Sequence, residues 1–220
     1  MPNFSGIWTV TQQMQAKGQS IWPSPPLVIG DAYQGGFFAG QISTAGNSIA
    51  DYNLVVGPVA TAQSTLEWKT TNTTTAGTSS VINGPANSAA MNDANHPCAQ
   101  FCEAVTAGSF TDWYMPAKNE LEICYYNLKP TTTSNVTSYG TNANAVPARA
   151  SNYTAGTPAQ TSATVFQNSN AQAYSASRYW SSTQDTSTSA YQMYFGNGGY
   201  QYGFQKANAF KVRAIRRVAV

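Results

Sequence analysis

The strongest constraint on the fold is a series of short strand-like runs near the C-terminal end of the chain. Four such runs lie at 179–182, 190–195, 200–205 and 210–218. An asparagine and two glycines at 197–199 separate two of them, a composition typical of a tight hairpin turn. Because side chains alternate along a strand, Tyr191, Met193 and Phe195 should face one way and Tyr194 the other. The pattern predicts an antiparallel meander.

Two helices are predicted ahead of this meander. Pro97 stands where a first-turn proline belongs, and apolar side chains recur at helical spacing from there to Gly108. Pro116 begins the second helix, whose apolar face continues until Pro130. Glu120 and Glu122, near the start of this helix, interact favourably with the helix dipole, and Glu120 is expected to cap or brace the helix start.

Strand signals also precede the helices. A run at 27–29 is followed by a predicted hairpin from 37–42 to 52–56, joined by turn-forming residues. Residues 70–95 and 131–177 show neither helical nor strand periodicity and are predicted to be loops. One short helix is predicted within the second of them, after Pro158. The order of elements predicts an α+β fold with two helices packed on short antiparallel sheets and with long loops.

The first residues differ from the rest. Trp8 and Trp22 bracket a polar segment that has no core of its own, and three prolines within four residues then stiffen the chain. Two interpretations stay open: a strap packed on its own domain, or an anchor docked into another subunit through Phe4, Trp8 and Trp22. We therefore divide the chain into an attachment segment, 1–26, and a domain, 27–220.

Low charge narrows the range of partners. Charged residues make up 9% of the chain, against about a quarter in a typical soluble domain, while 13 tyrosines are present. Such a surface suits rigid, hydrogen-bonding contacts. The net charge of +2 is too small for a polyanion binder, so no nucleic-acid partner is expected. The clustered basic residues are expected to be solvated and paired positions on a terminal strand: Lys206, Lys211, Arg213, Arg216 and Arg217.

No stretch approaches the roughly 18 consecutive apolar residues of a membrane span, so membrane insertion is not expected. The first residues also lack the basic and apolar segments of a secretory leader. We expect synthesis in a reducing cytoplasm.

Chemistry-bearing side chains are sparse. His96 is the only histidine and lies at a predicted helix start, where a structural role is expected. Glu120 and Glu122 are two positions apart on a helix, so they point to different sides and cannot act as an acid/base pair. No glycine-rich phosphate loop is present. We therefore predict no catalytic residue, no cofactor and no enzymatic activity.

The three cysteines, Cys98, Cys102 and Cys124, leave three alternatives. With His96 they would supply four zinc ligands. Cys102 and Cys124 would otherwise form a disulfide, or all three would be free thiols in the core, where cysteine is commonly buried. The apolar spacing favours free thiols, so no metal site is predicted.

Three ordered motifs carry a family resemblance. Residues 112–121 read DWYMPAKNEL, 179–183 read YWSST, and 212–218 read VRAIRRV. Together with Gly30-Asp31 and the Tyr-Gln-Gly-Gly sequence at 33–36, they resemble phage-borne C-type-lectin-like domains of the DUF1566 kind. That family is related to variable receptor-binding proteins of diversity-generating retroelements. The resemblance implies a C-type-lectin-like fold, in which Trp113 and Trp180 belong to the core.

The resemblance also implies a function. The opening from Gly6-Ile7-Trp8 to Trp22-Pro23 resembles the N-terminal segment of phage tail-fibre proteins. We therefore expect a virion protein that forms a trimer in the manner of phage fibres. It should contact other virion proteins through 1–26 and a host-surface receptor, glycan or protein, through its C-terminal strands. The candidate ligand residues are Tyr191, Tyr194, Asn197, Tyr200, Tyr202, Phe204 and Asn208. A turn at 197–199 that projects from the sheet should bring Tyr200 and Tyr202 beside Tyr194.

Two departures limit what the resemblance implies. The calcium-dependent sugar-binding tripeptides of true C-type lectins are missing, and so is a C-terminal cysteine pair of the kind used by formylglycine-generating enzymes. A purely structural virion component with a lectin-like fold and no ligand remains the alternative.

Overall fold

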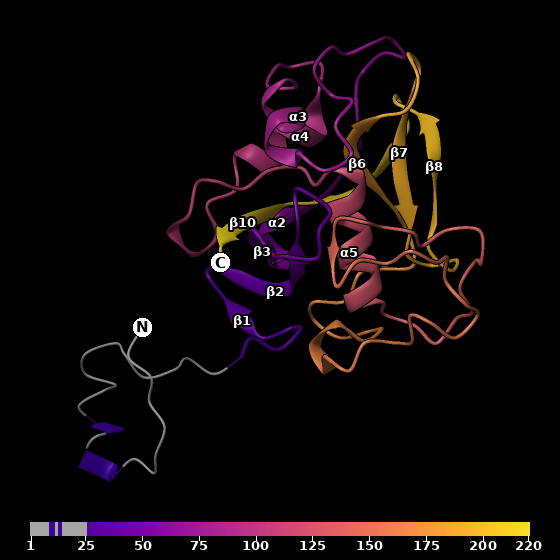
Figure 1. Cartoon of the computed structure of the whole chain (residues 1–220). Coiled ribbons are helices and arrows are strands. Elements are labelled where there is room, and N and C mark those ends of the chain that lie inside the picture. The colour runs from indigo at the N-terminus through magenta and orange to yellow at the C-terminus, as the bar shows by residue number, and fades with distance from the viewer. Residues whose placement is uncertain (1–8, 12, 15–25) are drawn as a thin grey trace.

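The computed structural model describes residues 9–11, 13–14 and 26–220, and they form an α+β fold with two five-stranded sheets (Figure 1). Sheet A has the order β1-β2-β3-β10, with β5 paired to β2; its strands are β1 (Ala32–Tyr33), β2 (Gly36–Ile42), β3 (Tyr52–Val56), β5 (Ala145–Val146) and β10 (Ile215–Ala219). Sheet B has the order β4-β9-β6-β7-β8; its strands are β4 (Gln63–Glu67), β6 (Arg178–Gln184), β7 (Ser189–Tyr194), β8 (Tyr200–Gln205) and β9 (Ala209–Arg213).

Between residues 26 and 220, four α-helices and two 3-10 turns accompany the sheets: α2 (Val59–Ala62), α3 (Gly84–Ala89), α4 (Pro97–Glu103), η1 (Ala107–Ser109), α5 (Lys118–Leu128) and η2 (Thr164–Phe166). The longest, α5, packs against β2 of sheet A and against β6 and β7 of sheet B. It therefore holds the two sheets together. No helix in the described ranges is long and apolar enough to cross a membrane.

The two predicted helices are confirmed as α4 and α5. Pro97 occupies the first turn of α4, as the sequence indicates. The hairpin is confirmed as β2 and β3, but the run at 27–29 is not a strand. The loop predicted for 70–95 also contains α3, because the Asn83 side chain accepts a hydrogen bond from the amide of Ala86 and Pro85 stands in its first turn.

The C-terminal meander is confirmed only for β6, β7 and β8, which pair in antiparallel order. The last predicted run divides into two strands of different sheets. β9 crosses to the other side of β6, where it pairs in parallel through Lys211 opposite Tyr179 and then pairs with β4. β10 joins β3 in sheet A. The buried Ala214 marks the crossing, with its backbone hydrogen-bonded to Gly57 and Ala62.

Buried side chains form two clusters. One lies around α5 and sheet A and contains Cys124 and Tyr179; the other lies around α4 and contains Trp113 and Trp180. Both tryptophans are at most 2% exposed, so the prediction that they belong to the core is confirmed.

The prediction that the C-terminal basic residues are solvated is wrong, whereas the predicted pairing on the terminal strand is confirmed for Arg216 with Asp112 and for Arg217 with Glu120. Lys206, Arg213 and Arg216 are all buried. Lys206 donates to the carbonyls of Thr73 and Ser187 and to the Gln184 amide oxygen, and burial lowers the pKa of its ammonium group to about 8. Nearby carbonyl acceptors satisfy Lys206 and Arg213 in place of water, whereas Arg216 donates to both carboxylate oxygens of Asp112.

Candidate functional site

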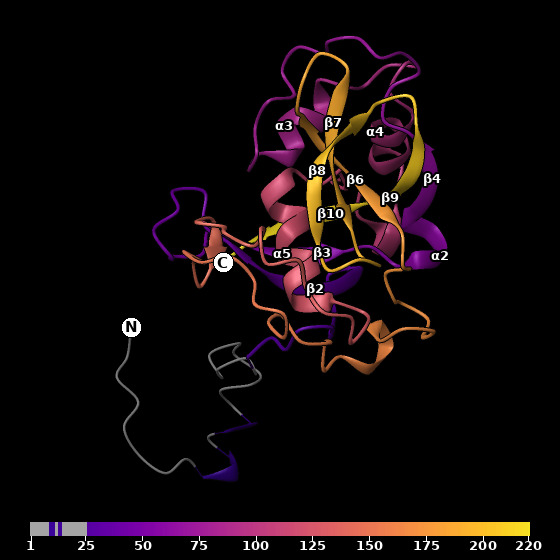
Figure 2. The same cartoon turned by 90° about the vertical axis from the view of Figure 1, so that its right-hand side faces the viewer.

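The candidate site lies on the face of sheet B away from α5. Figure 2 shows β8 and β7 in front of α5, with no helix over them. Tyr194 pairs with Tyr200 across β7 and β8, so both side chains lie on this face with Tyr202 and Phe204, two and four residues further along. All four are half-buried. Ring centroids are 5.7 Å apart for Tyr200 and Tyr202 and 6.3 Å apart for Tyr202 and Phe204.

Arg178 is the centre of this face. It pairs with Tyr194 across β6 and β7, and its guanidinium carbon lies 4.6 Å from the centre of the Tyr194 ring. The rings of Tyr202, Phe204 and Phe210 lie 5.4, 5.3 and 5.8 Å from the same atom. Nη1 of Arg178 donates a hydrogen bond of 2.8 Å to the Tyr202 hydroxyl. We call these five residues the aromatic cradle.

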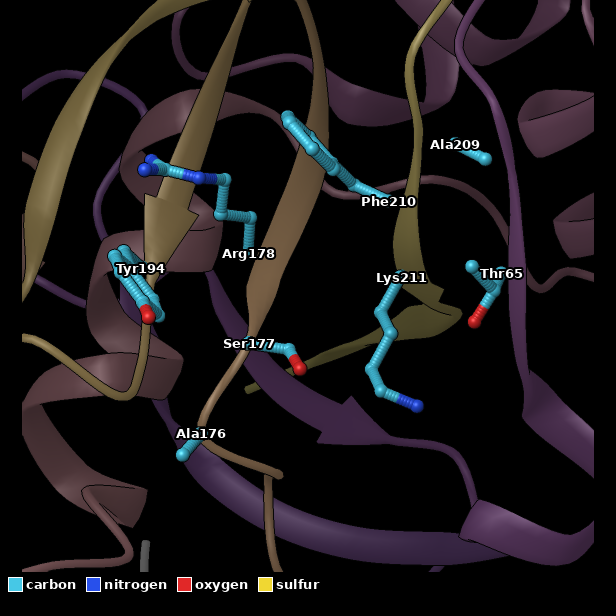
Figure 3. A pocket seen from close by; sticks show the side chains of 8 residues that line it. All are labelled: Thr65, Ala176, Ser177, Arg178, Tyr194, Ala209, Phe210 and Lys211. Carbon is cyan, nitrogen blue, oxygen red and sulfur yellow. The ribbon is translucent and has the colours of Figure 1, made fainter.

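A hollow of about 290 Å³ adjoins the aromatic cradle (Figure 3). Its lining residues come from four strands of sheet B (β4, β6, β7 and β9) and from the segment before β6: Thr65, Ala176, Ser177, Arg178, Tyr194, Ala209, Phe210 and Lys211. Arg178 and Lys211 are cationic, and none of these eight described residues is acidic. The arrangement offers aromatic faces and unopposed positive charge at one place.

The other predicted ligand residues are placed elsewhere. Tyr191 lies on the opposite face of β7, beneath the Lys118 ammonium group at 4.5 Å from its ring centre. The alternation predicted for Tyr191 and Tyr194 is therefore confirmed. Asn197 is exposed in the β7–β8 turn, and Asn208 is half-buried, with its carbonyl accepting a bond of 3.2 Å from the Trp180 indole.

The β7–β8 turn does not project as predicted. Gly198 and Gly199 are buried, and the Gly198 carbonyl accepts a hydrogen bond of 2.8 Å from the amide of Val136. Gly199 has a φ of +75° and lies against the Tyr125 ring. The loop after α5 therefore covers the turn. Tyr200 and Tyr202 nevertheless lie on the same face as Tyr194, as predicted.

The candidate anchor residues Phe4, Trp8 and Trp22 lie outside the described residues.

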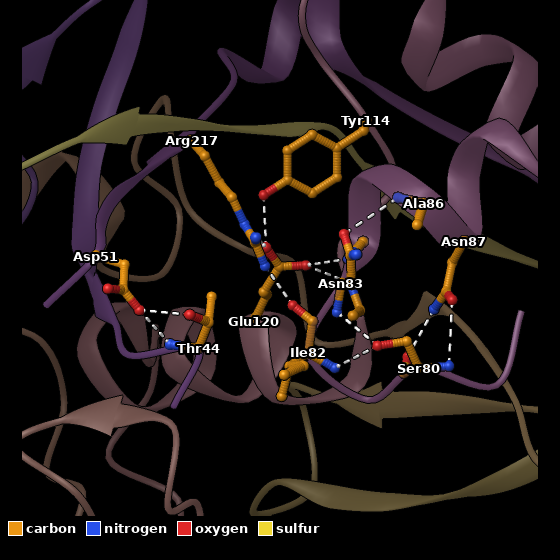
Figure 4. Close-up of polar contacts among 12 residues, drawn as sticks. Thr44, Asp51, Ser80, Ile82, Asn83, Ala86, Asn87, Tyr114, Glu120 and Arg217 are labelled. Atoms are coloured by element: carbon orange, nitrogen blue, oxygen red, sulfur yellow. Dashed lines mark hydrogen bonds and ion pairs between the residues drawn. The ribbon is translucent and has the colours of Figure 1, made fainter. Parts of the chain in front are cut away.

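Glu120, one of two buried carboxylates in α5, has a structural role (Figure 4). Glu120 is fully buried in the first turn of α5 and accepts hydrogen bonds from the Tyr114 hydroxyl at 2.5 Å and the Arg217 guanidinium at 2.8 Å. It also accepts one from the Ala117 amide at 2.8 Å, which confirms that it braces the helix start. Burial raises the pKa of Glu120, and Arg217 limits the rise.

Glu122 belongs to a separate network, so the two carboxylates do not converge. Its oxygens accept hydrogen bonds from the Tyr153 hydroxyl at 2.6 Å, from the Asn142 amide at 2.6 Å and from Arg149. Burial raises the pKa of Glu122, while the charge of Arg149 opposes the rise. These bonds join the long loop to α5.

His96 has both ring nitrogens engaged in hydrogen bonds. Nε2 lies 2.9 Å from the Thr75 hydroxyl and Nδ1 lies 2.8 Å from the Asp93 carboxylate. Burial lowers the pKa of the imidazole, although Asp93 opposes this. The ring therefore has the structural role expected of it at the start of α4.

The three cysteines do not lie together at one site. Cys98 and Cys102 lie in the cluster around α4, whereas Cys124 lies in the cluster around α5, and all three are free. Burial raises the pKa of each thiol, that of Cys124 to about 12. Within the described ranges, no three His, Cys, Asp or Glu side chains group as metal ligands.

Sequence reasoning missed Arg178, Phe210 and Lys211. For Arg178 the sequence holds one signal of its position. Arg178 is two residues before Trp180, so alternation along the strand puts both side chains on one face. The contributions of Phe210 and Lys211 depend on β9 crossing beside β6, which no local pattern indicates.

Comparisons with known proteins agree with part of the family resemblance. No curated protein matches the chain. Among solved structures, the chain is similar to a fimbrial protein from Bacteroides ovatus ATCC 8483, with 13% sequence identity and a TM-score of 0.44. That match covers 78% of this chain and 36% of the fimbrial protein, so the chain spans little more than a third of its length.

The model of the Lcl C-terminal domain family matches residues 57–216, which is most of the chain and includes the motifs at 112–121 and 179–183. This match supports the DUF1566-like part of the resemblance, and neither this family nor the fimbrial protein is described as a phage component. The chain belongs to the Lcl C-terminal domain family.

Proposed function

We propose that the chain is a non-enzymatic binding module with a C-type-lectin-like fold, displayed on a phage particle and directed at a host-surface receptor. The observation that carries the binding role is the aromatic cradle: half-buried rings gathered around a cation on an uncovered sheet face. Aromatic and arginine side chains dominate the energy of binding surfaces. The phage setting rests on the sequence resemblance.

Tyr200 is the best residue with which to test this face. It lies at the end of the ring series, 5.4 Å from Tyr139 and 5.7 Å from Tyr202, and does not contact the Arg178 guanidinium. Its truncation therefore removes exposed aromatic surface and leaves Arg178 in place. Ile49, 67% exposed in the β2–β3 turn of sheet A, provides a matched control for loss of apolar surface.

The experiment measures binding of the fluorescently labelled full-length chain to a panel of intact bacterial strains. We expect saturable binding to at least one strain. Tyr200→Ala should weaken it by roughly thirtyfold, the equivalent of about 2 kcal/mol, while Ile49→Ala binds like the wild type. Equal binding by both variants would place the receptor surface elsewhere. Failure of the wild type to bind any strain would favour the structural-component alternative.

Attachment to the particle is a separate part of the proposal. The Trp8–Trp22 segment would dock into another virion protein, and self-association into a trimer would raise avidity through several weak sites. Deletion of 2–24 tests the first point through incorporation into particles, and light scattering of the purified chain tests the second. Normal incorporation of the deletion variant, or a monomer at micromolar concentration, would refute the corresponding point.

A further inference from the structure

The hollow beside the aromatic cradle holds two cations without a counter-charge from its walls. Arg178 and Lys211 both line it, whereas none of its described lining residues is an aspartate or glutamate. Among the described residues, Lys211 makes no ion pair. Two like charges at one concave surface repel each other unless an anion lies between or beside them. The hollow is therefore electrostatically suited to an acidic ligand.

Arg178 is held in one orientation. Four rings surround its guanidinium, and the Tyr202 hydroxyl accepts its single hydrogen bond to a described residue, from Nη1. A guanidinium carries five N–H donors in a planar fork that matches a carboxylate. Because the rings restrict the side chain, binding an anion there costs little further conformational entropy.

The rest of the hollow suits a sugar. In Figure 3 the side chains of Arg178 and Lys211 extend to opposite sides of Ser177, so a ligand that meets both must span the hollow. The hydroxyls of Thr65 and Ser177 provide hydrogen-bonding partners, and the rings of Tyr194 and Phe210 provide apolar surface. A volume of about 290 Å³ suits a single small ring and is too small for a long polymer segment.

We propose that this hollow binds a single sugar acid, with the carboxylate on Arg178 and ring hydroxyls toward Lys211, Ser177 and Thr65. The inference rests on the proposed function and names the ligand chemistry of the same face. Two cations at one small, open hollow fit one acidic group, whereas a polyanion requires a broader basic surface.

The test is titration of the full-length chain, followed by NMR or calorimetry, with four probes: glucuronate, N-acetylneuraminate, glucose and glucose 6-sulfate. Glucuronate and glucose differ in the carboxylate alone. We expect at least one of the two sugar acids to bind roughly tenfold or more tightly than glucose. Their comparison separates a uronic acid from a sialic acid as the source of the carboxylate.

Variants assign the effect to the hollow. Arg178→Gln should abolish the preference for the acid over glucose, and Lys211→Gln should weaken binding several-fold. Lys69→Gln, which removes a cation outside the hollow, should bind like the wild type. Should Arg178→Gln lower the melting temperature, Arg178→Lys keeps the charge without the fork and should retain part of the preference.

Three results would overturn the inference. The first is equal affinity for glucose and both sugar acids, and the second is binding of glucose 6-sulfate as tight as, or tighter than, that of the sugar acids. The third is a preference for the sugar acid over glucose that survives Arg178→Gln. Each leaves the proposed function standing if cells still bind the chain and Tyr200→Ala still weakens that binding. If the chain does not bind cells but still prefers a sugar acid over glucose, the receptor role is refuted and the sugar-acid site stands.

Discussion

Nε of Arg217 donates a hydrogen bond of 2.8 Å to Oε1 of Glu120, and so ties the last strand of sheet A to the first turn of α5. Glu120 is fully buried and Arg217 nearly so, with 12% of its side chain exposed. A pair of this kind adds little net stability over an apolar pair, but removal of one partner leaves the other charge without compensation.

Glu120→Gln should therefore lower the free energy of unfolding by about 3–5 kcal/mol, because the Arg217 cation loses its counter-charge. Urea denaturation of the purified chain measures this. Glu103→Gln at the end of α4, which makes no ion pair with a described residue, should change it by at most about 0.5 kcal/mol. Equal effects of the two changes would show that the Glu120–Arg217 bond does not act as described.

His96 should make stability depend on pH. Burial lowers the pKa of the folded-state imidazole below its ordinary 6.5, so the unfolded chain binds this proton more readily. The contribution of His96 is fully present above pH 6.5 and is lost as the pH falls through the folded-state pKa, with a slope of at most about 1.4 kcal/mol per pH unit. His96→Gln should remove this slope.

The comparison between wild type and variant isolates the histidine. Glu120 and Glu122 have raised folded-state pKa values, so their contribution has the opposite sign: it is complete below their unfolded-state pKa and is lost as the pH rises through the folded-state value. This contribution is common to both proteins. Parallel curves of unfolding free energy between pH 7 and about pH 5 would contradict the prediction.

Gly199 should not tolerate a side chain. Its φ is +75°, and a Cβ there would lie 2.5 Å from the Tyr125 ring. Gly199→Ala should lower the free energy of unfolding by about 1–3 kcal/mol through backbone strain and steric overlap. Gly156 has open space around its Cβ position, so Gly156→Ala should leave stability unchanged or slightly raised. Thermal unfolding of both variants checks the contrast.

The thiols should be inert in the folded chain. Cys98, Cys102 and Cys124 are buried, and burial raises the pKa of each, so little thiolate is available for reaction. Ellman's reagent should react slowly with the native protein and should detect all three thiols after unfolding without reductant. Detection of one thiol would indicate a Cys102–Cys124 disulfide, and a chelator-dependent increase would indicate bound zinc.

The sequence predicted those parts of the structure that depend on near neighbours. Pro97 marked the beginning of α4, because a proline in the first turn costs no helical hydrogen bond, and Pro116 stands two residues before the first residue of α5. The opposite faces of Tyr191 and Tyr194 followed from the strand pattern, because alternation is a local property of extended backbone. Glu120 was recognised as a brace for α5 because its backbone partner is three residues away.

Only the tertiary structure decided where the last strands go and what surrounds Arg178. A run that reads as one strand divides at Ala214 because Arg213 pairs with β4 while Ile215 pairs with β3, and both partners are more than a hundred residues away. Phe210 and Lys211 reach the hollow only because β9 crosses to lie beside β6. Residue patterns encode which face of a strand is buried, but the choice of neighbouring strand depends on packing of the whole chain.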